Sequence, residues 1–210
     1  MIHRKEKFVF IHITKAAGQS VELAFGYTQE KSPMNGEFYV LGWSKEHKNW
    51  ISHWTMKSYI ERGLLSGYEY QTFFKFAFVR NPWARMVSEY HWKGGRMKGT
   101  SFKQFLKMPY EQLRKKYRQG GFDQHLRPQY LSIYADDGTL MVDFIGKVKN
   151  MKEDWEYVEK KLGRSIVLPR VNKTKHKHYS EYYDNETIGI IEERYGKDIS
   201  LFNYSFEDKR

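Results

Sequence analysis

The run Phe73–Val79 (Phe-Phe-Lys-Phe-Ala-Phe-Val) constrains the fold more than any other segment, because Arg80-Asn81-Pro82 follows it without a linker. Its aromatic and β-branched side chains predict a buried strand. Asn81 is a good helix cap and Pro82 suits the first position of a helix. A strand that leads directly into a helix indicates an α/β arrangement.

A second strand with its own turn precedes this one. Phe8–Ile13 is aromatic and β-branched, the small-residue turn Lys15–Ser20 follows, and a helix is expected from Ser20 to Phe25. Met141–Val148 predicts a third strand. Apolar residues at helical spacing predict helices that contain Met56, Tyr59, Ile60 and Leu64, then Trp83, Met86, Val87 and Tyr90, then Trp155, Val158 and Leu162 before Gly163, and Ile188, Ile191 and Tyr195 before Gly196.

This alternation predicts the α/β class. We expect a single domain over residues 1–210, with a central, mostly parallel sheet and helices on both faces. In such sheets, ligands bind at the carboxyl ends of the strands.

Composition narrows the function. The chain has 210 residues and no cysteine, which excludes disulfides, cysteine nucleophiles and Cys-ligated metal sites. The first apolar stretch is too short for a membrane span or a signal peptide, so we expect a cytoplasmic protein. Lys and Arg number 36 against 25 Asp and Glu, and the net charge of +11 predicts an anionic partner.

The turn Lys15–Ser20 has the parts of an anion-binding loop. Its small residues 16–18 let an anion approach the backbone N–H groups, Lys15 adds a point charge, and Ser20 offers a hydroxyl. It is not a Walker A loop, because Lys15 precedes Gly18. The alternative is an ordinary tight turn.

Arg80 and Ser88 form a second candidate site. A guanidinium at the carboxyl end of a strand lies where α/β sheets bind ligands, and it can hold a phosphate through two hydrogen bonds. The alternative is that Arg80 caps a helix or pairs with an acid. Two such sites in a basic chain favour a nucleotide with two separated anionic groups.

Both segments resemble one enzyme family. Phe10–Ser20 (Phe-Ile-His-Ile-Thr-Lys-Ala-Ala-Gly-Gln-Ser) resembles the 5′-phosphosulfate loop of sulfotransferases that use 3′-phosphoadenosine 5′-phosphosulfate (PAPS). The match is to the carbohydrate branch, of the heparan sulfate 2-O-sulfotransferase type, with the usual form F-I-H-I-P-K-T-A-G-T-S. Phe76–Tyr90 resembles the family's 3′-phosphate motif. Four later segments follow in the family's order: His125–Gln129, Val142–Gly146, Leu168–Thr174 and Asp198–Tyr204.

The resemblance spans almost the whole chain and implies a P-loop-NTPase-like sulfotransferase fold. It implies a nucleotide-binding core at about residues 7–26 and 70–92. Acceptor-side segments are expected at about 27–49 and 93–130, and a segment that closes over the nucleotide at about 168–180.

The resemblance also implies residue roles. Lys15 would contact the phosphosulfate and stabilise the leaving phosphate, while Ser20 and the backbone of Ala16, Ala17, Gly18 and Gln19 would hold the 5′ side. Arg80 and Ser88 would hold the 3′-phosphate, and Lys173 and Thr174 would close over the nucleotide. The departures from the family pattern are Thr14 for Pro, Ala16 for a hydroxyl residue, Gln19 for Thr and Lys149 for Glu.

Sulfuryl transfer to an alcohol needs a base, and histidine is the commonest one near neutral pH. His53 is our first candidate, because a His at about this place is the base in related carbohydrate enzymes. His47 is the second candidate and His125 the third. His12 is predicted to be a hydrogen-bonded structural residue, and Glu22 and Glu89 to be surface or capping groups on helices.

The sequence therefore predicts a metal-independent enzyme that transfers the sulfuryl group of PAPS to a hydroxyl and releases PAP. The acceptor is expected to be a saccharide. Five basic residues in the acceptor-side segments have two interpretations: they bind an acidic polymer, or they form a solvated helix face. They are Arg96, Arg114, Lys115, Lys116 and Arg118. No nucleic acid partner is expected. The alternative functions are PAP binding without catalysis, a small nucleotide kinase and a polyanion-binding protein. The acceptor's identity and the oligomeric state are not determined by the sequence.

Overall fold

The computed structural model describes residues 1–27, 38–39, 43–44, 49–92, 99–109, 111–113, 124–169, 171 and 177–210, with the backbone alone at 38–39, 43–44 and 49–50. Contacts divide the chain into two compact units. The first contains Met1–Val79 and Leu131–Val171, and the second contains Arg80–Tyr130 and Asn172–Arg210. A single domain over 1–210 stays a prediction.

The first unit contains the sheet. Among the described residues, five strands pair in the order β3-β1-β2-β6-β7. Their bounds are β1 Ile2–His3, β2 Phe8–Ile11, β3 Phe38–Tyr39, β6 Phe74–Val79 and β7 Phe144–Lys147. β2, β6 and β7 are parallel, and β1 is antiparallel to both of its neighbours. The predicted α/β class and mostly parallel sheet are confirmed.

The central strands form where the apolar runs predict them. β2 and β6 pair with Phe10 opposite Phe76, and both strands lie in the protein interior. Parallel strands are covered on both faces, which explains why these runs are apolar without alternation. β7 is shorter than the predicted strand over Met141–Val148.

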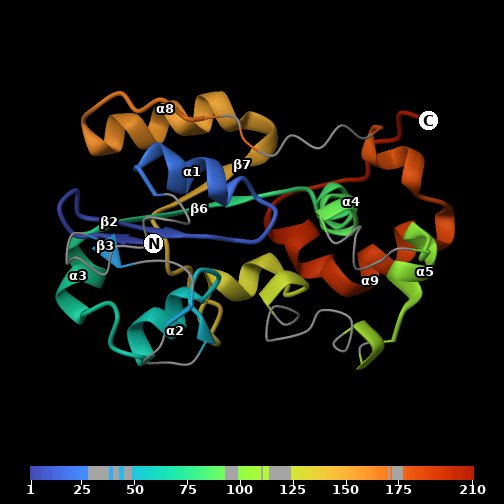
Figure 1. Cartoon of the computed structure of the whole chain (residues 1–210), viewed down its shortest axis with the longest axis horizontal. Coiled ribbons are helices and arrows are strands. Elements are labelled where there is room, and N and C mark those ends of the chain that lie inside the picture. The colour runs from blue at the N-terminus through green and yellow to red at the C-terminus, as the bar shows by residue number, and fades with distance from the viewer. Residues whose placement is uncertain are drawn as a thin grey trace. The chain divides into compact units, whose positions relative to one another are not determined.

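Helices cover both faces of this sheet (Figure 1). α1 (Gly18–Ala24) and α8 (Met151–Leu162) lie on one face, while α2 (Met56–Glu61) and α3 (Gly67–Thr72) lie on the other. On the first face, Phe8, Phe10 and Phe76 pack with Phe25 and Trp155 in one aromatic core. The small strands β4 (Trp43–Ser44) and β5 (Asn49–Trp50) pair with each other as a separate ribbon. The short 3₁₀ helix η2 (Val148–Asn150) leads from β7 into α8, and η1 (Gln129–Ser132) lies where the two units meet in the chain.

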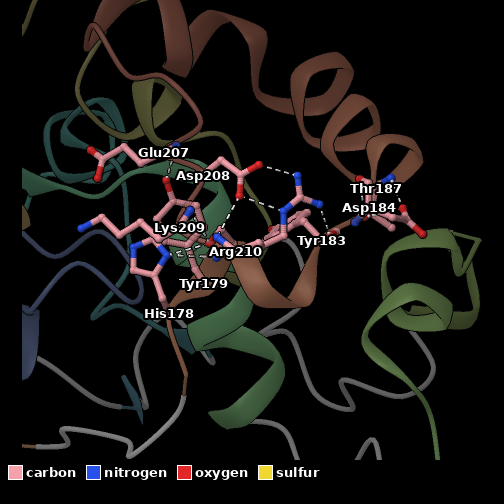
Figure 2. Close-up of polar contacts among 10 residues, drawn as sticks. His178, Tyr179, Tyr183, Asp184, Thr187, Glu207, Asp208, Lys209 and Arg210 are labelled. Atoms are coloured by element: carbon pink, nitrogen blue, oxygen red, sulfur yellow. Dashed lines mark hydrogen bonds and ion pairs between the residues drawn. The ribbon is translucent and has the colours of Figure 1, made fainter.

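The second unit contains α4 (Pro82–Trp92), α5 (Phe102–Lys107), α9 (Asn185–Leu201) and the 3₁₀ helix η3 (Tyr179–Tyr182). Trp83, Val87, Phe105 and Ile191 contribute to its apolar core. The last residues of the chain are bonded to η3 (Figure 2). The N–H of Glu207 donates to Tyr179 Oη at 2.7 Å, and Arg210 Nη1 donates to the Tyr183 carbonyl at 3.0 Å.

Two helix boundaries follow their local signals, but the helix predicted to include Leu64 is shorter, because α2 ends at Glu61. Asn81 caps α4, since its Oδ1 accepts from Ala84 N–H at 3.2 Å, and Gly163 ends α8 in the left-handed conformation. The expected end of the last helix before Gly196 coincides with a kink at Tyr195, beyond which a second helical stretch continues α9 to Leu201. Its backbone departs from helical geometry at Tyr195 (φ −124°, ψ 22°) and then resumes.

No described helix is both long enough and apolar enough to cross a membrane.

Candidate functional site

The loop between β2 and α1 has an unusual backbone. Lys15 and Ala17 both adopt left-handed conformations, with φ of 61° and 65°. Such conformations cost about 1–3 kcal/mol for residues other than glycine, and strain of this kind concentrates at functional sites. Backbone hydrogen bonds between residues three apart turn the loop, since Ala16 N–H donates to Ile13 O at 3.3 Å and Ser20 N–H to Ala17 O at 3.0 Å. The loop is therefore held in one shape by its own backbone.

The side chain of His12 packs against this loop at Gly18. Gly18 lies so close to the His12 ring that a Cβ at position 18 would overlap it, which requires glycine there. The His12 ring is buried, and its Nδ1 is hydrogen-bonded to Glu22 Oε1. The structural role predicted for His12 agrees with these contacts. The prediction that Glu22 is a surface or capping group is wrong, because Glu22 is only 5% exposed and pairs with His12.

His53 lies against the same end of β2. Its Nδ1–H donates to the backbone carbonyl of His12 at 3.2 Å, and the two imidazole rings meet edge to face at 4.4 Å. A carbonyl can only accept, so Nδ1 carries the proton in this bond. In neutral His53 the basic nitrogen of the ring is then Nε2, the nitrogen that a general base would use. His53 is partly exposed, and Lys15 follows His12 by three residues in the chain.

The residues that depart from the family pattern lie in different environments. Thr14 and Ala16 are buried, at 2% and 1% exposure, so neither side chain is free in solvent. Gln19 is exposed and Ser20 partly buried at the start of α1. Lys149 is exposed in η2.

Arg80 joins the end of β6 to α4 and is partly buried. Burial is the main cause that lowers the pKa of Arg80 to about 10; Tyr204 opposes this shift and the nearby Arg85 cation adds to it. Arg80 is still charged at neutral pH. Two guanidinium groups therefore share a partly buried region, where an anion is favoured.

Arg85 and Ser88 follow Arg80 on α4 and are both buried. Arg85 Nη2 donates to the carbonyls of His125 at 2.8 Å and Arg127 at 2.9 Å, which ties α4 to the segment that leads to Gln129. Sequence reasoning gave Arg85 no role. Its partners are distant in the chain, so no local pattern could have shown them.

His125, the third candidate base, is a buried residue of the second unit. Its Nδ1 lies 3.0 Å from Glu89 Oε2, and Trp92 stacks on its ring at 4.5 Å. Glu89 is 0% exposed, so its predicted surface or capping role is wrong as well. His47, Lys173 and Thr174 lie outside the described residues, as do Arg96, Arg114, Lys115, Lys116 and Arg118.

In the ranges that the structure describes, no three His, Asp or Glu side chains gather as a metal site requires. The positive groups described above come from Lys15 in the first unit and from Arg80 and Arg85 in the second.

Comparison with known proteins identifies the family of the chain. An uncharacterized protein from Archaeoglobus fulgidus is 31% identical over 129 residues, which cover 60% of this chain and 94% of that protein. No solved structure matches the chain. The family model described as "Sulfotransferase family" matches residues 1–205. The chain therefore belongs to the sulfotransferase family.

Proposed function

We propose that the protein transfers the sulfuryl group of PAPS to a hydroxyl of a carbohydrate and releases PAP. The observation that carries this proposal is the strained loop with Lys15 at the carboxyl end of β2, in a chain of the sulfotransferase family. A loop of this kind binds the anionic part of a nucleotide through its backbone.

The residues proposed to bind the 5′-phosphosulfate and those proposed to bind the 3′-phosphate belong to different units. In the first unit, Lys15 and the loop 16–20 hold the 5′-phosphosulfate. In the second unit, Arg80 and Ser88 hold the 3′-phosphate. The roles of Lys173 and Thr174 rest on the family resemblance alone.

The transfer step uses Lys15 and His53. The acceptor oxygen forms a bond to sulfur while the bond from sulfur to the bridging phosphate oxygen breaks. His53 Nε2 takes the hydroxyl proton, and Lys15 stabilises the negative charge that develops on the leaving phosphate. The hydrogen bond from His53 Nδ1 to the His12 carbonyl supports the choice of Nε2 as the basic nitrogen in this step.

The acceptor side is assigned to residues 27–49 and 93–130. The chain's net charge of +11 favours an acidic saccharide over a neutral one. Arg side chains bind carboxylates and sulfates through paired hydrogen bonds, and aromatic rings stack on sugar faces.

A transfer assay tests the proposal. The purified protein is incubated with radiolabelled PAPS and a panel of neutral polysaccharides, acidic polysaccharides and simple phenols. We expect label on a saccharide with wild-type protein and none with His53→Asn. PAP binding without transfer to any acceptor would instead support the non-catalytic alternative. Magnesium-dependent ATP hydrolysis would support a kinase, and steeply salt-dependent polyanion binding without PAP binding would support a polyanion-binding protein.

A further inference from the structure

Two segments of the family pattern each contribute one side chain that supports the backbone of Arg80. Gln129 ends the segment that begins at His125, and Asp198 starts the segment that ends at Tyr204. Both side chains are fully buried, at 0% exposure. Both lie in the second unit, with Arg80.

The side-chain amide of Gln129 is bonded to both backbone polar groups of Arg80. Oε1 accepts from Arg80 N–H at 2.8 Å, and Nε2 donates to the Arg80 carbonyl at 2.8 Å. The orientation of the amide follows from chemistry, since an N–H only donates and a carbonyl only accepts. Arg80 is thus held by a pair of bonds at the one position between the end of β6 and the cap of α4.

Asp198 in turn holds Gln129. Its carboxylate accepts from the backbone N–H groups of Gln129 at 2.7 Å and Tyr130 at 2.9 Å, and Gln129 Nε2 lies at 3.4 Å. Burial raises the pKa of Asp198, and the bonds from Gln129 and Tyr130 oppose that rise. The N–H groups of Gln129 and Tyr130 therefore offset the cost of burying the Asp198 carboxylate, and the carboxylate in turn fixes their positions.

The departure of α9 from helical geometry accompanies this arrangement. It occurs at Tyr195, whose hydroxyl donates to the Leu126 carbonyl at 2.9 Å, and Asp198 follows within one turn. Both ends of the segment 126–130 are thus attached to the last part of α9.

We propose that Gln129 and Asp198 are positioning residues for the 3′-phosphate of the nucleotide. They fix the backbone from which the Arg80 guanidinium extends, so that less ordering is left for the binding step. This inference rests on the proposed function, in which Arg80 contacts that phosphate.

Calorimetric titrations with PAP and with 5′-AMP test the inference, since the ratio of the two affinities measures the contribution of the 3′-phosphate. We expect Gln129→Met and Asp198→Asn to lower that ratio about tenfold, which is the loss of one charge-assisted contact, while the affinity for AMP stays unchanged. Asp184→Asn is the matched control. Asp184 also accepts a backbone N–H on α9, from Thr187 at 2.9 Å, and it is bonded to neither Arg80 nor Gln129. A merely structural role would lower both affinities or neither.

A double-mutant comparison completes the test. In an Arg80→Ala background, neither Gln129→Met nor Asp198→Asn should change the ratio further, because both act through Arg80. An undiminished ratio in either folded single variant, or a full additional loss in the Arg80→Ala background, would overturn the inference and leave the proposed function standing. If Gln129→Met does not fold, Asp198→Asn carries the test, since asparagine retains one acceptor oxygen. A wild-type protein without preference for PAP over AMP would overturn both.

Discussion

At the scale of single residues, the proposed role of Lys15 depends on its place in the loop after β2 and not on its positive φ alone. Lys7 offers a matched control, because it also has a positive φ, at 52°, but lies exposed before β2. We expect Lys15→Ala to lower turnover about a hundredfold, the effect of removing one group that stabilises developing charge. Lys7→Ala should leave turnover unchanged. Steady-state kinetics with PAPS measure both, and equal effects of the two substitutions would contradict the role of Lys15.

His53 is the residue to which the proposed mechanism assigns the general base. Its replacement by Asn should lower kcat about a hundredfold or more, the usual contribution of a general base. PAP affinity should be retained, because His53 has no role in nucleotide binding. His178→Asn is the control, since His178 belongs to the second unit and its Nδ1 is bonded to Ser180. Full turnover by folded His53→Asn protein would remove His53 from the mechanism.

At the scale of elements, the loop between β2 and α1 depends on the absence of a side chain at position 18. Gly18→Ala would place a Cβ against the His12 ring, which Glu22 prevents from moving away. Gly146→Ala is the control, because its Cβ would meet the Phe78 ring in the core. Both substitutions should lower stability by about 1–3 kcal/mol through overpacking, and only Gly18→Ala should also abolish PAP binding. Thermal melting and calorimetry separate the two effects; retained PAP affinity in Gly18→Ala would contradict the proposed loop.

Besides the apolar contact between α5 and α9, a group of exposed ion pairs links α5 to the start of α9, and its contribution to stability should depend on pH. Lys103 Nζ lies 2.7 Å from Asp184 Oδ2 and 2.8 Å from Glu186 Oε2. The hydrogen bond from Lys103 is the main cause that lowers the pKa of Asp184, and the N–H of Thr187 lowers it further. Because the folded-state pKa is depressed, Asp184 contributes stability above its ordinary pKa, and that stability is lost as the pH falls through the folded value.

Asp184→Asn isolates this effect, since asparagine keeps the helix cap and removes the charge. The stability difference between wild type and Asp184→Asn should be largest at neutral pH and should shrink as the pH falls from about 5 toward 2. Added salt should shrink it too, because both groups are exposed. Urea denaturation across this range measures the difference, and a difference independent of pH and salt would show that the ion pair contributes nothing.

Elements with strong local signals could be predicted from the sequence. The apolar runs that contain Ile11 and Val79 predicted the strands β2 and β6. Asn81 predicted the start of α4, and Gly163 predicted the end of α8. The strand β1 has only two residues, too few for a pattern. Burial of Glu22 and Glu89 was missed because each pairs with a histidine on another element, which no local pattern reveals. The bond between Gln129 and Arg80 joins residues 49 apart and was missed for the same reason.

At the scale of the whole molecule, the family and the fold class rest on direct findings, whereas the reaction and the residue roles are proposals. The sulfotransferase family and the α/β class are supported across residues 1–205 and by the described sheet. The donor and the roles of Lys15, His53 and Arg80 are proposals supported by the geometry of each unit, while the acceptor is a proposal that rests on the family resemblance and the net charge. They share one requirement, which is that the protein binds a nucleotide carrying a 3′-phosphate.

That requirement gives the most direct measurement, a calorimetric titration of the wild-type protein with PAP, with 5′-AMP and magnesium ATP as controls. The account predicts tight binding of PAP without added metal, much weaker binding of AMP, and loss of the PAP preference in Arg80→Ala. If the folded protein does not bind PAP, or binds magnesium ATP in preference to it, the proposed donor and the roles of Lys15 and Arg80 are wrong.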